Sequence, residues 1–178
     1  MAKKALIVID VQQGLFATQP APFEAAQIIE RINALARRAR AANTPVLWVQ
    51  HENDGALAFQ SPGWQLDAGL DVHASDVLVR KKTPDSFHRT DLGEVLERLG
   101  IDSLAVAGYA SEFCVDATVR RAAALGYPVE VVADAHTTHD KAHASAAMIR
   151  THHNATLSNI TSFGPKISAV PSDEWGFA

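Results

Sequence analysis

The chain has 178 residues, of which 47% are hydrophobic and 20% are charged, and its formal net charge is −4 at pH 7. This length suits a single domain over residues 1–178, and the composition is that of an ordinary globular protein. The negative charge and the lack of a basic stripe exclude nucleic acid binding as the main function. We therefore expect a small-molecule substrate, and no nucleic acid, as the partner.

The first apolar run, ALIVIDV at residues 5–11, is too short to cross a membrane. Asp10 interrupts this run, which therefore also fails to fit a secretory signal peptide. The chain has one cysteine, Cys114, so no disulfide can form within it, as is typical of proteins in a reducing cytoplasm. We expect a cytoplasmic protein with no membrane partner.

Short apolar runs alternate with helical patterns along the whole chain. Such runs, rich in β-branched residues, are typical of parallel strands covered by helices on both faces. The alternation predicts an α/β fold, a three-layer αβα sandwich whose Rossmann-like sheet is mostly parallel and has about six strands. The expected strands are residues 5–11, 45–50, 76–80, 103–109 and 128–134, with a last short one near 155–157. The expected helices are residues 23–40, 90–99, 111–125 and 140–152.

Residues 51–75 break this rhythm, because they are rich in turn residues and long for a connection in a compact domain. Loops of this length often serve as lids or binding loops. Trp64 lies within this loop, and aromatic side chains in loops often close a binding site or an interface. We expect this segment to shape the substrate pocket.

Two charged residues stand at predicted strand ends, where ligands bind in open parallel sheets. Asp10 ends an apolar run and is costly to bury without a partner, so it is either a general base or the cap of a neighbouring turn. If Asp10 is a general base, Lys81 is its expected ion-pair partner, and alternation would place Lys81 on the same face of its strand as Val79. The run Arg80-Lys81-Lys82 also fits a solvated surface, and both interpretations stay open.

Cys114 follows the fourth predicted strand, and it is either a small buried apolar residue or a nucleophile. If Ser111 is the N-cap of the next helix, Cys114 lies in the first helical turn. The helix dipole would then lower the pKa of the thiol, as in reactive cysteines. Gly108 would allow the backbone to turn closely there. The residues alone do not decide between the two roles.

Three segments, at residues 5–16, 77–92 and 106–138, resemble three ordered signatures of the isochorismatase-like cysteine hydrolases. This family includes nicotinamidases and N-carbamoylsarcosine amidohydrolases. The resemblance extends from about residue 4 to residue 157. It implies a catalytic triad of Asp10, Lys81 and Cys114. Lys81 corresponds to the family's catalytic lysine, because that lysine stands six residues before the phenylalanine that corresponds to Phe87.

The resemblance also implies a mechanism. A cis peptide bond would join Tyr109 to Ala110, and the backbone N–H groups of Ala110 and Cys114 would form an oxyanion hole. Asp10 would deprotonate Cys114, and the thiolate would cleave an amide-type C–N bond through a thioester. Ordinary pKa values, about 3.9 for aspartate and 8.5 for cysteine, oppose this transfer. We expect the helix dipole and Lys81 to lower the pKa of Cys114.

The sequence departs from the metal-binding branch of the family. Nicotinamidases hold a divalent metal with an Asp-x-His and a distant histidine, whereas residues 50–54 here read QHEND. We therefore expect no metal and no cofactor. His136, His139 and His143 are interpreted as surface histidines near a helix start. The presence of Cys114 favours amide chemistry over the vinyl-ether hydrolysis of isochorismatases proper.

The substrate and the assembly are less constrained. Alternatives are a hydrolase of a carbamoyl, ureido or cyclic-imide compound, and a binder on the same fold with an idle thiol. Family members are commonly oligomers, so a dimer or tetramer is expected, through the loop of Trp64 or the last helix near residues 152–154. The nominated substrate-binding residues are Phe16, His51, Trp64, Phe87, Glu112 and Phe113, although Phe16 and Phe87 would also suit a core and Glu112 a helix dipole.

Overall fold

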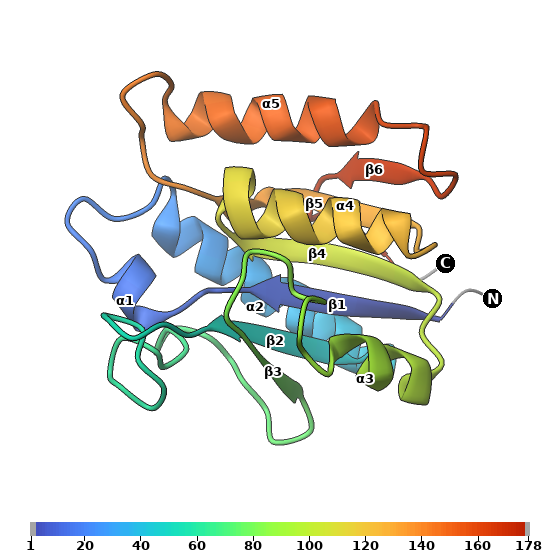
Figure 1. The fold of residues 1–178 in the computed structure, drawn as a ribbon, viewed down its shortest axis with the longest axis horizontal. Coiled ribbons are helices and arrows are strands. Elements are labelled where there is room, and N and C mark those ends of the chain that lie inside the picture. The colour runs from blue at the N-terminus through green and yellow to red at the C-terminus, as the bar shows by residue number, and fades with distance from the viewer. Residues whose placement is uncertain (1–2, 177–178) are drawn as a thin grey trace.

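The computed structural model describes residues 3–176, and within them one parallel six-stranded sheet runs through the centre (Figure 1). Neighbouring strands are all parallel, in the order β3-β2-β1-β4-β5-β6. The α/β sandwich with a Rossmann-like sheet is therefore confirmed. The strands are β1 (Lys4–Ile9), β2 (Val46–His51), β3 (Val77–Lys81), β4 (Ser103–Tyr109), β5 (Val129–Thr137) and β6 (Ile167–Val170).

Helices cover both faces of the sheet, because the central strands are apolar on both sides. Helix α2 packs on one face, against Leu6, Val8 and Trp48. Helices α3 and α4 and the end of α5 pack on the other face, around Ile7 and Val106. The helical segments are α1 (Gln13–Phe16), α2 (Ala25–Ala41), α3 (Leu92–Leu99), the π-helical turn η1 (Ser111–Val115), α4 (Asp116–Ala124) and α5 (Ala146–Ser158).

The C-terminal part differs from the sequence-based prediction. The strand predicted near residues 155–157 is wrong, because these residues belong to α5 and the sixth strand lies ten residues further on. The side chain of Ser145 accepts a hydrogen bond from the backbone N–H of Met148 and caps α5. The carboxylate of Asp140 also accepts one from the N–H of Ala146, at 2.7 Å. These contacts start the helix six residues later than predicted.

Among the described residues, no helix combines the length and the apolar character needed to span a membrane.

Candidate active site

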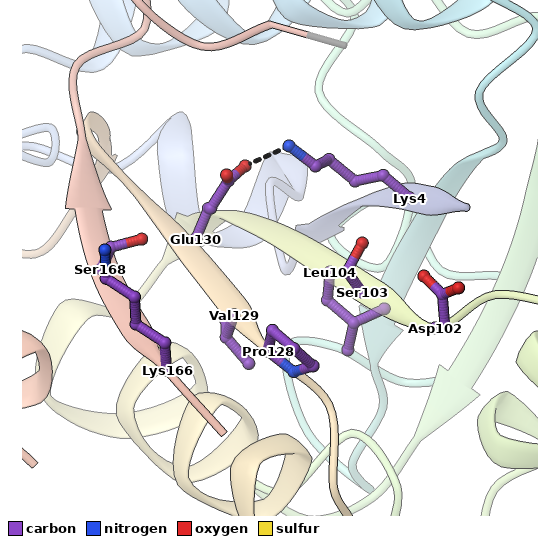
Figure 2. A pocket seen from close by; sticks show the side chains of 9 residues that line it. All are labelled: Lys4, Asp102, Ser103, Leu104, Pro128, Val129, Glu130, Lys166 and Ser168. Atoms are coloured by element: carbon purple, nitrogen blue, oxygen red, sulfur yellow. Dashed lines mark hydrogen bonds and ion pairs between the residues drawn. The ribbon is translucent and has the colours of Figure 1, made fainter. Parts of the chain in front are cut away.

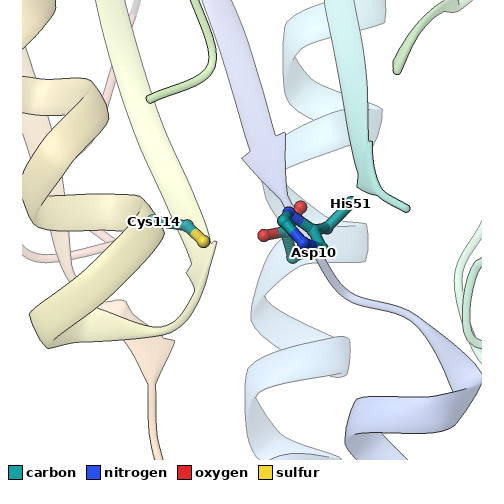
Figure 3. Close-up of side chains that lie close together, drawn as sticks. All are labelled: Asp10, His51 and Cys114. Atoms are coloured by element: carbon teal, nitrogen blue, oxygen red, sulfur yellow. The ribbon is translucent and has the colours of Figure 1, made fainter. Parts of the chain in front are cut away.

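The two central strands bring the candidate site together. Strands β1 and β4 are neighbours, but the chain leaves β1 toward α2 on one face and leaves β4 toward α4 on the other. Such a switch point opens a crevice beyond the carboxyl ends of the strands. Asp10 follows β1 directly, and η1 with Cys114 follows β4. Figure 3 shows the side chains of Asp10 and Cys114 turned toward one another from these elements, with His51 from the end of β2 beside them.

Lys81 links these side chains. Its Nζ lies 2.7 Å from Oδ2 of Asp10, 3.3 Å from Sγ of Cys114 and 3.1 Å from Nδ1 of His51. Asp10 and Lys81 are only 1% and 2% exposed. Alternation along β3 buries Val79 and Lys81 and leaves Arg80 exposed. The structure thus places an ion pair beside a thiol in a site shielded from water.

The backbone at the ends of β1 and β4 is unusually close. Gly108 has φ +117°, and a Cβ atom there would lie 2.1 Å from the carbonyl oxygen of Ile9. Only glycine fits such a contact in this conformation. Asp10 has φ +52°, in the left-handed region that aspartate tolerates better than most residues. Together these features hold the carboxylate of Asp10 next to the strand that delivers Cys114.

The start of the cysteine helix differs from the prediction. Ser111 is not the N-cap: the residue before η1 is Ala110, whose extended backbone enters a π-helical turn. The carbonyl of Ala110 accepts hydrogen bonds from the N–H groups of Phe113 and Val115. The hydroxyl of Ser111 instead contacts His136, at 2.8 Å. The peptide bond between Tyr109 and Ala110 is cis.

The electrostatics of Cys114 also differ from the prediction. Burial, followed by the facing carboxylate of Asp10, raises the pKa of the thiol to about 12, and the ammonium of Lys81 opposes this rise only in part. The predicted lowering of this pKa is therefore wrong. The sequence could not show that the thiol is half-buried or that it faces a carboxylate.

His51 and Asp10 have electrostatic features of their own. Burial and the charge of Lys81 lower the pKa of His51, so its ring is neutral near pH 7. Oδ1 of Asp10 is buried and, within residues 3–176, has no hydrogen-bond partner. This oxygen is therefore free to accept a hydrogen bond.

Gln12 is a structural residue of the site that the sequence analysis missed. Its Nε2 donates to the carbonyls of His51 and Trp64, at 2.9 and 2.8 Å, and its Oε1 accepts from the backbone N–H of His51. The side chain is fully buried. Gln12 therefore fixes both the end of β2 and the long loop. Its position in the sequence, two residues after Asp10, is the feature that could have identified it.

The nominated aromatic residues lie in different surroundings. Phe16 is buried and its ring meets that of Tyr109 edge-on, at 5.9 Å. Trp64 packs edge-on against Phe59, at 5.0 Å, and its indole Nε1 is buried with no partner among the described residues. Phe87 packs against the core and stacks with a tyrosine ring at 6.1 Å, so its surroundings are those of a core residue.

Glu112 and Phe113 directly precede Cys114 in η1. Oε1 of Glu112 accepts a hydrogen bond from Thr138, at 2.8 Å, and forms an ion pair with Lys141, at 3.1 Å. Phe113 is 57% exposed. Tyr109 has its pKa raised to about 12 by burial and then by Glu112 and Cys114.

The histidines near β5 only partly match the sequence-based interpretation. His136 is not a surface residue: it is fully buried, with Nδ1 at 2.8 Å from Ser111 Oγ and Nε2 at 2.8 Å from Oδ1 of Asn154. Two partners distant in the chain explain this burial. His139 lies 2.8 Å from the hydroxyl of Tyr109, and His143 is exposed.

Two cavities differ in their position relative to the cluster of Asp10, Lys81 and Cys114. A cavity of about 510 Å³ lies at the opposite end of the sheet, beside the ion pair of Lys4 and Glu130 at 2.6 Å (Figure 2). It holds none of the side chains described above. A recess of about 260 Å³ is lined by residues around Lys81, including Glu52 and Thr83.

The fold and these side chains define a class: an α/β protein with a buried Asp–Lys ion pair beside a half-buried cysteine at the switch point of a parallel sheet. The isochorismatase domain model matches residues 4–162, so the chain belongs to the isochorismatase family.

Known proteins of this family are similar over different shares of the chain. A streptothricin hydrolase of Streptomyces noursei is 40% identical over 77% of this chain, and the chain spans about half the length of that enzyme. A ureidoacrylate amidohydrolase of Methylobacterium radiotolerans is 28% identical, covering 95% of this chain and 77% of its own. A crystal structure of an isochorismatase family protein is 31% identical, with a TM-score of 0.87 over 96% of this chain and 99% of its own.

Proposed function

We propose that this protein is a cysteine hydrolase that cleaves an amide-type C–N bond of a small metabolite through a thioester. One observation carries the proposal: the ammonium of Lys81 contacts both the carboxylate of Asp10 and the sulfur of Cys114. A buried base, a cation and a thiol in mutual reach are the parts that nucleophilic catalysis needs. Membership of the isochorismatase family supports the same chemistry.

In the first half of the reaction, the sulfur of Cys114 attacks the substrate carbonyl while the thiol proton passes to Oδ1 of Asp10. The backbone N–H groups of Ala110 and Cys114 stabilise the oxyanion. The C–N bond then breaks, and Asp10 gives its proton to the departing nitrogen. An acyl thioester and a free amine or ammonia result.

In the second half, Asp10 removes a proton from water and the hydroxide attacks the thioester. The C–S bond breaks, the acid leaves, and the sulfur of Cys114 regains the proton from Asp10. The raised pKa of the thiol keeps the sulfur protonated at rest. Proton transfer therefore accompanies attack, and the ammonium of Lys81 stabilises the negative charge as it develops on sulfur.

A second candidate is hydrolysis of a ureido or carbamoyl compound by the same groups. It is favoured by the similarity to a ureidoacrylate amidohydrolase over most of the chain. Both candidates use the same thioester or thiocarbamate step, and both can release ammonia. They differ in the substrate that is turned over.

The test is ammonia release from a panel of primary amides, ureido compounds and cyclic imides, with isochorismate consumption measured alongside. We expect turnover of at least one C–N substrate, and a loss on the order of a thousandfold or more in Cys114→Ala. Met148→Ala, a change at an exposed position of α5, serves as the matched control and keeps activity. If neither wild type nor Cys114→Ala turns over any compound of the panel, the hydrolase proposal is wrong and a binding function is left.

A further inference from the structure

The ammonium of Lys81 has three hydrogen-bond partners. It carries three N–H donors and cannot accept. Three side-chain atoms lie around it, on Asp10, His51 and Cys114, at 2.7, 3.1 and 3.3 Å. Each of these atoms therefore acts as an acceptor. The number of donors matches the number of acceptors, which fixes the position of the nitrogen.

This geometry indicates which tautomer His51 adopts. Nδ1 faces an ammonium, so Nδ1 carries the lone pair and the ring proton is on Nε2. The ring is half-buried between Lys81, Asp10 and Glu52. Gln12 holds the backbone N–H and carbonyl of His51 at the same time. The imidazole is thus a rigidly placed neutral acceptor.

The same three acceptors resemble the donor set of a metal site. Their ligand atoms lie within 4.8 Å of one another, and a carboxylate, an imidazole and a thiolate suit Zn²⁺. The ammonium of Lys81 already contacts all three. A divalent cation among these atoms would meet a buried positive charge at short range, which is strongly unfavourable. Lys81 takes the role that a metal ion would have in this arrangement.

We propose that His51 is a positioning residue: it is the third acceptor that fixes the ammonium of Lys81 between the carboxylate of Asp10 and the sulfur of Cys114. This inference rests on the proposed function, because it takes Cys114 as the nucleophile. It replaces the expectation that His51 binds the substrate. His51 acts through Lys81, which lowers the cost of forming a thiolate at Cys114.

The test uses iodoacetamide, which alkylates the single cysteine of the chain. His51→Leu removes the acceptor without changing the charge of a neutral ring, whereas His51→Gln keeps an acceptor oxygen. At pH 9 we expect alkylation of His51→Leu to be roughly tenfold slower than that of wild type, since Lys81 no longer stays beside the sulfur. Alkylation of His51→Gln should stay within about threefold of wild type. Cys114→Ala provides the blank.

Two results would overturn the inference: His51→Leu alkylated as fast as wild type, or His51→Gln as slow as His51→Leu. A second measurement does not depend on whether His51→Leu folds. Nitrogen-15 NMR of wild type, with His51 assigned by its loss in His51→Gln, should show the Nε2–H tautomer, and the Nδ1–H tautomer would contradict the proposal. Neither readout needs a substrate, so a protein that passes here and fails the ammonia assay disproves only the hydrolase function.

Discussion

The carboxylate of Asp10 and the thiol of Cys114 share one hydrogen-bond donor, the ammonium of Lys81, at 2.7 and 3.3 Å. The carboxylate therefore has two opposing effects. As a negative charge it raises the pKa of the thiol, and as a base it is the group that can remove the thiol proton. Under the proposed function, the thiol stays protonated until its attack on a carbonyl makes proton transfer to Asp10 favourable.

Asp10→Asn separates these two effects. Removal of the negative charge lowers the pKa of Cys114, because the raising contribution of Asp10 is lost while Lys81 stays. We expect alkylation by iodoacetamide at pH 8 to be about tenfold faster than in wild type, while hydrolysis is abolished because the base is gone. Asp102→Asn, at the other end of the sheet, is the control that changes neither rate. Slower alkylation in Asp10→Asn would show that the carboxylate does not oppose the thiolate.

Lys81→Ala should uncover a binding site for a soft metal ion. With the ammonium removed, Asp10, His51 and Cys114 keep ligand atoms within 4.8 Å of one another. Thiolate and imidazole ligands favour Zn²⁺ and similar ions. We expect Cd²⁺ to give a thiolate charge-transfer band in the ultraviolet with Lys81→Ala, one ion per chain, and none with wild type. The double variant with Cys114→Ala is the control, and a band of equal strength in wild type would contradict the prediction.

The sequence predicted most of the fold because the physical signals were local. Apolar runs marked five of the six strands, and alternation around Val79 correctly placed Lys81 on the buried face of β3. Asp10 and Cys114 were marked as candidates by their positions at strand ends, but their roles stayed open there, and the catalytic triad was implied only by the family resemblance. The cytoplasmic location, the oligomeric state and the single-domain extent stay predictions from the sequence.

The failures came from contacts between distant parts of the chain. His136 was misjudged because its burial depends on Ser111 and Asn154, 25 and 18 residues away. The pKa of Cys114 was predicted in the wrong direction because neither its burial nor its facing carboxylate is visible in a local pattern. The start of α5 was the exception, since the capping residue Ser145 is a local signal that could have been used.

Gly108→Ala should destabilise the protein and disturb the site together. The new Cβ would lie 2.1 Å from the carbonyl oxygen of Ile9, in a conformation with φ +117°. We expect a loss of at least about 2 kcal/mol in the free energy of unfolding, measured by urea denaturation. Gly93→Ala is the matched control: it lies in α3 with open space around it, and it should stabilise the protein by up to about 1 kcal/mol. If both variants have equal stability, the backbone of β1 can move away from β4.

The buried imidazole of His136 should make stability depend on pH. Ser111 and Asn154 enclose a neutral ring, and burial lowers its pKa from 6.5 to about 4. Between these pH values the unfolded chain binds a proton that the folded chain does not, so stability falls as the pH drops from 6.5 toward 4. The full effect is roughly 3 kcal/mol.

His136→Gln tests this dependence. Because glutamine does not titrate, the variant should lose most of the fall in the free energy of unfolding between pH 6.5 and 4.5, a window above the titration of most carboxylates. His143→Gln, which changes an exposed histidine, should keep the wild-type slope. Urea denaturation at several pH values measures all three proteins. A wild-type slope in His136→Gln would mean that His136 takes up its proton without unfolding, and that the contacts joining η1 to α5 survive a charged ring.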